Sequence, residues 1–285
     1  MNRIESLPFN TYDVIGYLAP GFLLLFWSVN LFNAIWGDVF TFLNQEFSFV
    51  GQSIIIILIA TTSYAMGHII AIGASESIER ICTSLIGHPS LYLIQKENLD
   101  FQKIYSNFKL YHKTNIGMIV NIILFFPIYL IIFIYSVTGN IKFIAKRLGD
   151  NEIFLLREKF NNKYGISIDS NPDWFSICTS HCFNHNQFIA QRAYNYVVIY
   201  GFCRNMSFVT NFIFFFGLVF ILSFGTLISQ DFSGWITFNY KYYIILYFFI
   251  PLISLLFSVM LSISFIKFQR RYAEEIIKSF IAMND

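Results

Sequence analysis

The residues best suited to chemistry form a Cys/His group in the stretch ICTSHCFNH. Its members are Cys178, His181, Cys182 and His185. Residues three and four apart are neighbours on a helix, so this spacing places all four on one helix face. Cys178 with Cys182, or His181 with His185, could provide two ligands to one zinc ion. The sequence therefore provides two of the four ligands that a structural zinc site needs.

A complete zinc site would need ligands from elsewhere. Four ligands on one straight helix cannot converge on one ion, because the first and last lie about 10 Å apart along the axis. No Glu stands between the two His residues, so the sequence does not support a helical zinc hydrolase motif. We expect the group to serve mainly in packing, with zinc as the alternative and no other cofactor. The further ligands would come from Cys203, His88, His112 or a second subunit.

His68 is the one clearly ionisable residue well within an apolar stretch. Ionisable residues at membrane depth are functional candidates. The alternative is a neutral imidazole hydrogen-bonded to a neighbouring helix near the membrane interface, and we favour this alternative. No Asp, Glu, Lys or Arg lies deep in an apolar stretch, which argues against an ion-coupled transporter.

Two stripes of small residues recur at every fourth position. Small side chains on one helix face let backbones approach closely, and hydroxyls bond across the contact. We expect the stripes to pack helices, within the chain or between copies. The alternative is a weakly polar lining of a water-filled path. The stripes consist of Ser63, Gly67 and Ala71, continued by Ser75, and of Ser254, Ser258 and Ser262.

The elements that must position these residues are apolar helices. Of the 285 residues, 56% are apolar and 13% are charged, against about 25% charged in soluble domains. This composition excludes a soluble globular protein and a disordered chain. Five stretches reach the roughly 20 residues that a membrane-spanning helix needs. They are Val14–Trp36, Val50–Ala74, Gly117–Val137, Phe208–Ser229 and Tyr242–Phe268.

The third of these stretches, Gly117–Val137, differs from the others. Pro127 lies near its centre and breaks or bends a helix, because proline has no backbone N–H. Lys and Arg residues resist translocation. If Gly117–Val137 enters and leaves on one side, 18 of the 19 Lys and Arg residues fall on the cytoplasmic side. We therefore predict four crossings with both termini cytoplasmic. The alternative is a fifth, kinked crossing.

The predicted fold is all-α and polytopic. It has four transmembrane helices, a re-entrant or interfacial helical hairpin at 117–137, and a cytoplasmic helical layer. We divide the chain into a first transmembrane helix pair (1–74), a cytoplasmic or interfacial helical region that includes the hairpin (75–206), a second transmembrane helix pair (207–268) and a cytoplasmic tail (269–285).

Three segments carry a resemblance to a known group of proteins. They are YDVIGYLAPGFL at 12–23, GHIIAIGASESIER at 67–80 and IYGFCRNMSF at 199–208. Together they resemble uncharacterised bacterial multi-pass inner-membrane proteins, some of them associated with phage-defence loci. The resemblance implies an inner-membrane location and a role in antiviral defence. It implies no catalytic residue.

The leading functional hypothesis is a non-enzymatic membrane effector or adaptor. It would act in the inner membrane as a homo-oligomer packed through the small-residue faces. A cytoplasmic protein partner would bind its helical layer and lead to membrane perturbation or pore opening. No basic face with interleaved aromatic residues is present, so we expect no direct nucleic-acid binding. The alternatives are a membrane-embedded metal-dependent hydrolase and a small-solute channel or transporter.

Overall fold

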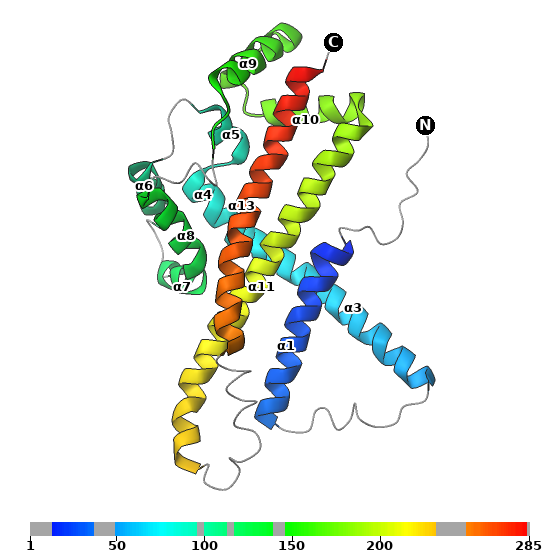
Figure 1. Cartoon of the computed structure of the whole chain (residues 1–285), viewed down its shortest axis with the longest axis vertical. Coiled ribbons are helices and arrows are strands. Elements are labelled where there is room, and N and C mark those ends of the chain that lie inside the picture. Colours follow the sequence, from blue (N-terminus) through cyan, green and yellow to red (C-terminus); the bar gives the residue numbers. More distant parts are fainter. Residues whose placement is uncertain are drawn as a thin grey trace. The chain divides into compact units, whose positions relative to one another are not determined.

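The computed structural model describes residues 13–36, 49–95, 100–112, 117–138, 146–231 and 249–283 (Figure 1). Every regular element in these ranges is helical, which confirms the all-α prediction. The elements are η1 Asp13–Leu18, α1 Ala19–Trp36, α3 Phe49–Ala74, η2 Ser75–Glu79, α4 Arg80–Ile86, α5 Pro89–Ile94, α6 Phe101–Tyr111, α7 Gly117–Leu124, α8 Phe126–Val137, α9 Asp150–Tyr164, η4 Ile168–Ser170, α10 Trp174–His185, α11 Gln187–Asp231 and α13 Ile250–Ala282.

Four helical segments in the described ranges are long and apolar enough to cross a membrane, which agrees with the predicted number. They are Asp13–Leu31, Gly51–Ile94, Gln187–Val219 and Ile250–Ala282. The helix α11 runs unbroken for 45 residues, so the predicted boundary at 206/207 falls inside it. The segment 242–248 at the start of the last predicted stretch lies outside the described residues.

The apolar stretch 117–137 forms two short helices, α7 and α8, as the proline predicts. The break falls at Phe125, two residues before Pro127. The two helices have 8 and 12 residues, so each is shorter than the roughly 20 residues of a membrane crossing. Whether the pair crosses the bilayer together stays a prediction.

The chain divides into two compact units that interleave along the sequence. Unit 1 comprises 1–78, 120–127 and 201–262, and unit 2 comprises 79–119, 128–200 and 263–285. The units therefore differ from the contiguous segments expected from the sequence, because α11 and α13 each contribute to both.

The core of unit 1 lies where α1, α3 and α11 meet. Figure 1 shows α3 crossing α1 and α11 obliquely. Trp27 from α1, Ile70 from α3, and Val209 and Ile213 from α11 form its buried centre. These side chains come from all three helices, so the crossing is a packed contact.

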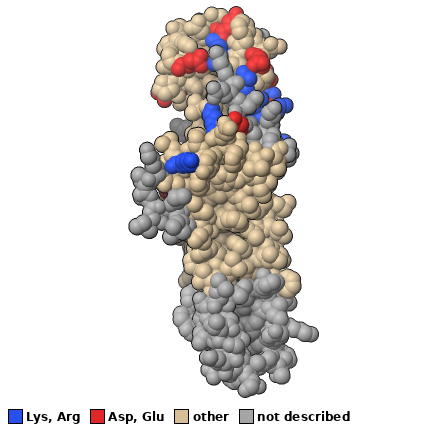
Figure 2. Space-filling model, turned by 90° about the vertical axis from the view of Figure 1, so that its left-hand side faces the viewer, with Lys and Arg blue, Asp and Glu red and all other residues tan. Residues whose placement is uncertain are grey.

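Unit 2 is a helical layer with its own core and its own ion pairs. Large side chains such as Leu156, Phe160 and Phe280 are fully buried in it. Lys278 Nζ on α13 lies 3.4 Å from a Glu152 carboxylate oxygen on α9. In Figure 2 the charged side chains gather at the upper end of the view, where α9 and the C-terminal part of α13 carry Lys, Arg, Asp and Glu residues. The charged surface seen there thus belongs to unit 2.

Candidate functional site: a helix crossing held by asparagine and glycine

Three segments singled out in the sequence, 12–23, 67–80 and 199–208, lie largely in unit 1. They supply the η1–α1 junction, the middle and end of α3, and the part of α11 that follows residue 200. The contact is built from three features: a proline break, two glycines and an aromatic group. Each can be traced to particular residues.

The proline break lies at the start of α1, where the π-helical turn η1 precedes Pro20. A helical residue normally donates its N–H to the carbonyl four positions earlier, but Pro20 has no N–H to give to Gly16. Instead, Asn205 Nδ2 on α11 donates to the Gly16 carbonyl at 2.8 Å. Asn205 is fully buried. A side chain from a distant helix therefore donates to the carbonyl that a residue with an N–H at position 20 would bond in an α-helix.

A second asparagine donates to a backbone carbonyl near the second proline. Asn211 Nδ2, less than two turns further along α11, donates to the carbonyl of Leu124 at the end of α7. Pro127 follows three residues later. Helix ends leave carbonyls without intrahelical partners, and these must be satisfied when water is excluded. Asn205 and Asn211 thus tie both breaks of unit 1 to α11.

The two glycines let the backbones of α1 and α3 touch. A Cβ added to Gly21 would lie 1.8 Å from the Ser63 carbonyl oxygen, and one added to Gly67 would lie 2.0 Å from the Tyr17 carbonyl oxygen. Both obstacles are backbone atoms, which cannot rotate away. Because each helix presents its glycine to the backbone of the other, no larger residue fits at either position in this arrangement.

An aromatic group covers the edge of the same crossing. The ring of His68 stacks on Tyr17 with 4.2 Å between centroids, and it meets Tyr64 edge-on at 4.6 Å. His68 itself is exposed on the outside of unit 1. The imidazole of His68 therefore lies between two tyrosine rings at the surface of an apolar helix.

The serines of α13 meet α11 at a separate contact within unit 1. Ser207 Oγ and Ser262 Oγ are 2.7 Å apart, and Ser207 Oγ also donates to the Ser258 carbonyl at 3.2 Å. Ser207, Ser258 and Ser262 are fully buried, and Ser254 is 7% exposed. The hydroxyls of Ser207 and Ser262 are thus engaged with one another in this conformation.

The predicted small-residue stripes both lie at contacts within one chain. Ser63 faces Gly21 of α1, Gly67 faces Tyr17 of η1, and Ala71 is 9% exposed. The hydroxyl of Ser63 is buried without a hydrogen-bond partner among the described residues. An oligomer packed through these faces, as the sequence suggested, would compete with the contacts seen here. If copies of the chain assemble, they would do so through other surfaces.

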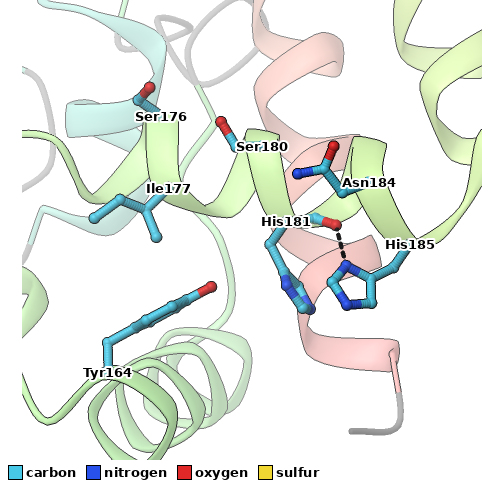
Figure 3. A pocket seen from close by; sticks show the side chains of 7 residues that line it. All are labelled: Tyr164, Ser176, Ile177, Ser180, His181, Asn184 and His185. Carbon is cyan, nitrogen blue, oxygen red and sulfur yellow. Dashed lines mark hydrogen bonds between the residues drawn. The ribbon is translucent and has the colours of Figure 1, made fainter.

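The Cys/His group lies on α10 in unit 2. Cys178 and Cys182 are fully buried, and Cys182 Sγ donates to the Ile276 carbonyl at 3.6 Å. Burial raises the pKa of the Cys178 thiol to about 12 and that of the Cys182 thiol to about 11. The imidazoles of His181 and His185 instead line a pocket at the surface (Figure 3). In the described ranges, no three His, Cys, Asp or Glu side chains are grouped as a metal site.

Sequence reasoning did not select Asn205, Asn211, Gly21 or Ser207. One signal was available, because Asn205, Ser207 and Asn211 are polar residues near or within an apolar stretch, where each must find a partner. Identifying those partners, which are the Gly16 and Leu124 carbonyls and the serines of α13, needs the three-dimensional contact. No family model, no curated protein and no solved structure matches the chain.

Proposed function

We propose that the chain is a multi-pass integral membrane protein whose helices α1, α3, α11 and α13 cross the bilayer. The observation that carries this proposal is the large amount of apolar side-chain surface that unit 1 leaves uncovered. Ile56 is 67% exposed, Ile72 68% and Met260 64%. Exposed apolar area costs about 25 cal/mol per Å² in water, and lipid removes that cost. A bilayer therefore accounts for this surface.

Unit 2 would lie on the cytoplasmic side of the inner membrane. Its surface carries Arg147, Arg157 and Arg192, each paired with a carboxylate. Lys and Arg near membrane helices favour the cytoplasmic side. The same unit exposes large apolar side chains to water, including Phe154, Leu155 and Phe188. A cytoplasmic protein partner could cover them.

The protein would work as a non-enzymatic effector or adaptor that couples such a partner to membrane perturbation or pore opening. In unit 1, the polar groups of Asn205, Asn211 and Ser207 are committed to helix contacts, so they support a structural role for that unit. The resemblance of three segments to inner-membrane proteins near phage-defence loci extends the proposal to antiviral defence.

Cysteine labelling in intact cells tests the membrane arrangement. The four native cysteines are replaced first, and a single cysteine is then placed at the exposed positions Lys109 or Lys146. A membrane-impermeant maleimide should label neither position until the membrane is permeabilised, because both would be cytoplasmic. Asn44→Cys, in the loop predicted to be periplasmic, is the positive control. One labelled and one protected position would show that the stretch 117–137 crosses, giving five crossings.

Phage challenge and liposome flux test the effector role. Cells that express the protein should keep their membrane potential until infection, and should then lose it and restrict phage growth. Gly67→Leu, which disrupts the α1–α3 crossing, should abolish the response, whereas Ala65→Leu on an exposed face of α3 should not. Ion flux through liposomes containing the purified, unstimulated protein would favour the channel alternative.

A further inference from the structure

We propose that His181 and His185 form a binding site for a divalent transition-metal ion at the mouth of the α10 pocket. This goes beyond the effector role, which needs no metal. The proposal rests on the geometry of the two imidazoles, on the proton position in one of them, and on the oxygen atoms around them.

The two imidazoles are one helical turn apart and lie together. Their ring centroids are separated by 4.0 Å, with the ring planes at 40° to one another. Figure 3 shows both rings on the same side of α10, next to the pocket. Residues four apart on a helix share a face, so both side chains can reach one ion without a change of the backbone.

The hydrogen bond of His185 fixes where its lone pair lies. Nδ1 of His185 is 2.9 Å from the carbonyl oxygen of His181. A carbonyl can only accept, so Nδ1 carries the proton and Nε2 of the neutral ring carries the lone pair. Metal-ligating histidines commonly donate their other ring nitrogen to a backbone carbonyl in this way. The structure thus orients His185 as a metal ligand would be oriented.

The pocket supplies space and oxygen atoms for the remaining coordination positions. Its volume is about 330 Å³. Tyr164, Ser176, Ser180 and Asn184 line it together with the two histidines, and the Tyr164 hydroxyl points toward His181 (Figure 3). Imidazole nitrogen suits Zn²⁺, Ni²⁺ and Cu²⁺, and water or these oxygen atoms can complete the coordination.

The neighbouring cysteines are not part of the proposed site. Cys178 and Cys182 are fully buried, away from the surface pocket. The ligand set is therefore two nitrogens with water or oxygen, which leaves positions open for exchange. Such a site is of the regulatory or ligand-accepting kind, whereas a closed structural zinc site would use four protein ligands.

Metal titration of the full-length protein in detergent tests the site. The protein must carry a purification tag without histidine, because a polyhistidine tag would itself bind the metal. Isothermal titration with Zn²⁺ should show one ion per chain. His181→Ala and His185→Ala should each weaken binding by at least about tenfold, since outer-shell partners alone are worth about 10–100-fold. His88→Ala removes a lone exposed histidine and should leave the affinity unchanged.

Electron paramagnetic resonance with Cu²⁺ provides a readout that a loss of folding would not imitate. The wild-type spectrum should show two imidazole nitrogens coordinated to Cu²⁺, and the spectrum of His185→Ala should show fewer. Gel filtration of His185→Ala should be unchanged, which shows that the variant is folded. The proposal is overturned if Zn²⁺ does not bind at millimolar concentration, or if the double His181→Ala/His185→Ala variant binds as well as wild type. Loss of binding in Cys182→Ser with retention in both histidine variants would assign the metal to the thiols and would also overturn it.

Discussion

At the residue scale, the side-chain amides of Asn205 and Asn211 on α11 have the same hydrogen-bonding role. Each donates its side-chain amide to a backbone carbonyl beside a proline break, at Gly16 and at Leu124. Inside a membrane an unsatisfied carbonyl costs several kcal/mol, because no water can replace the lost partner. The two amides of α11 therefore each supply a hydrogen bond to a backbone carbonyl near a proline.

A double-mutant cycle tests this dependence between Asn205 and Pro20. Asn205→Ala leaves the buried Gly16 carbonyl unsatisfied and should lower the free energy of unfolding by about 1–3 kcal/mol. Pro20→Ala restores a backbone N–H, so Asn205→Ala should cost less in that background. Unfolding in mixed micelles measures all four proteins. Equal costs in the two backgrounds would show that Asn205 acts independently of the proline.

The buried thiols of α10 lead to a prediction about pH. Their folded-state pKa values of about 12 for Cys178 and about 11 for Cys182 lie above the ordinary value of 9.0. At pH 8 the buried Cys182 thiol is therefore largely protonated, so iodoacetamide should label the folded protein far more slowly than the denatured protein. The folded state holds these protons more tightly. The stability they contribute is complete below pH 9 and is lost as the pH rises toward 12.

Equilibrium unfolding between pH 7 and 11 checks the direction of this dependence. The free energy of unfolding should fall above pH 9, and Cys178→Ala/Cys182→Ala should reduce that fall. Rapid alkylation of both thiols at pH 8 in the folded protein would contradict the burial described here.

At the scale of helices, close backbone approach dominates the contacts of unit 1. Gly21 and Gly67 bring α1 and α3 together, and Gly217 lies against Pro251 where α11 meets α13. In lipid there is no hydrophobic force between apolar helices, so packing and a few hydrogen bonds hold them together. Each of these positions is therefore sensitive to added volume.

Gly67→Leu should insert into the membrane normally but destabilise the crossing. Leu favours insertion by a few tenths of a kcal/mol, whereas overpacking costs about 1–3 kcal/mol. Membrane levels should be unchanged, and thermal stability in detergent should fall. Ala65→Leu on the same helix adds the same side chain at an exposed position and should be neutral. A Gly67→Leu protein as stable as wild type would mean that α1 and α3 do not touch here.

Two substitutions of Ser258 distinguish the effect of added side-chain volume from the effect of losing the hydroxyl. Its Oγ makes only a long contact of 3.4 Å to the Ser207 carbonyl among the bonds described, so Ser258→Ala should be nearly silent. Ser258→Leu should destabilise the α11–α13 contact, because the side chain is fully buried. If the alanine variant is as damaging as the leucine variant, the hydroxyl is required, and a polar path becomes the better interpretation.

Sequence patterns located the helices better than they located the contacts between them. Hydropathy and length identified the four long apolar helices, and Pro127 indicated the division of 117–137. The four-residue spacing selected Gly67, but not its counterpart Gly21, since Gly21 lies in no repeat. The partners of Asn205 and Asn211 are about 190 and 90 residues away along the chain, a separation that local patterns do not encode.

At the scale of the whole molecule, both units expose large apolar side chains, such as Ile56 and Met260 in unit 1 and Phe154 and Phe188 in unit 2. The charged surface seen in Figure 2 belongs to unit 2. Lys278 on α13 pairs with Glu152 on α9, and Arg192 on α11 pairs with Glu275 on α13. These exposed pairs contribute little individually, typically below about 1 kcal/mol.

The next prediction concerns the number of chains that assemble. Because both small-residue stripes are occupied within one chain, a homo-oligomer must form through other apolar surfaces. Native mass spectrometry from detergent should show more than one chain, and Ser258→Ala should leave the subunit number unchanged. A strictly monomeric protein at every concentration would contradict the oligomeric effector.

The bond between Asn205 and the Gly16 carbonyl also has a consequence for biosynthesis. The ribosome reaches Asn205 about 185 residues after Pro20, which takes roughly 10–40 s at ordinary rates of translation. In the proposed membrane arrangement, the start of α1 would then lie in or near the membrane with a carbonyl whose native partner does not yet exist. A chaperone, the insertion machinery or interfacial water must accommodate this group. The contacts of α1 are thus complete only when α11 has been made.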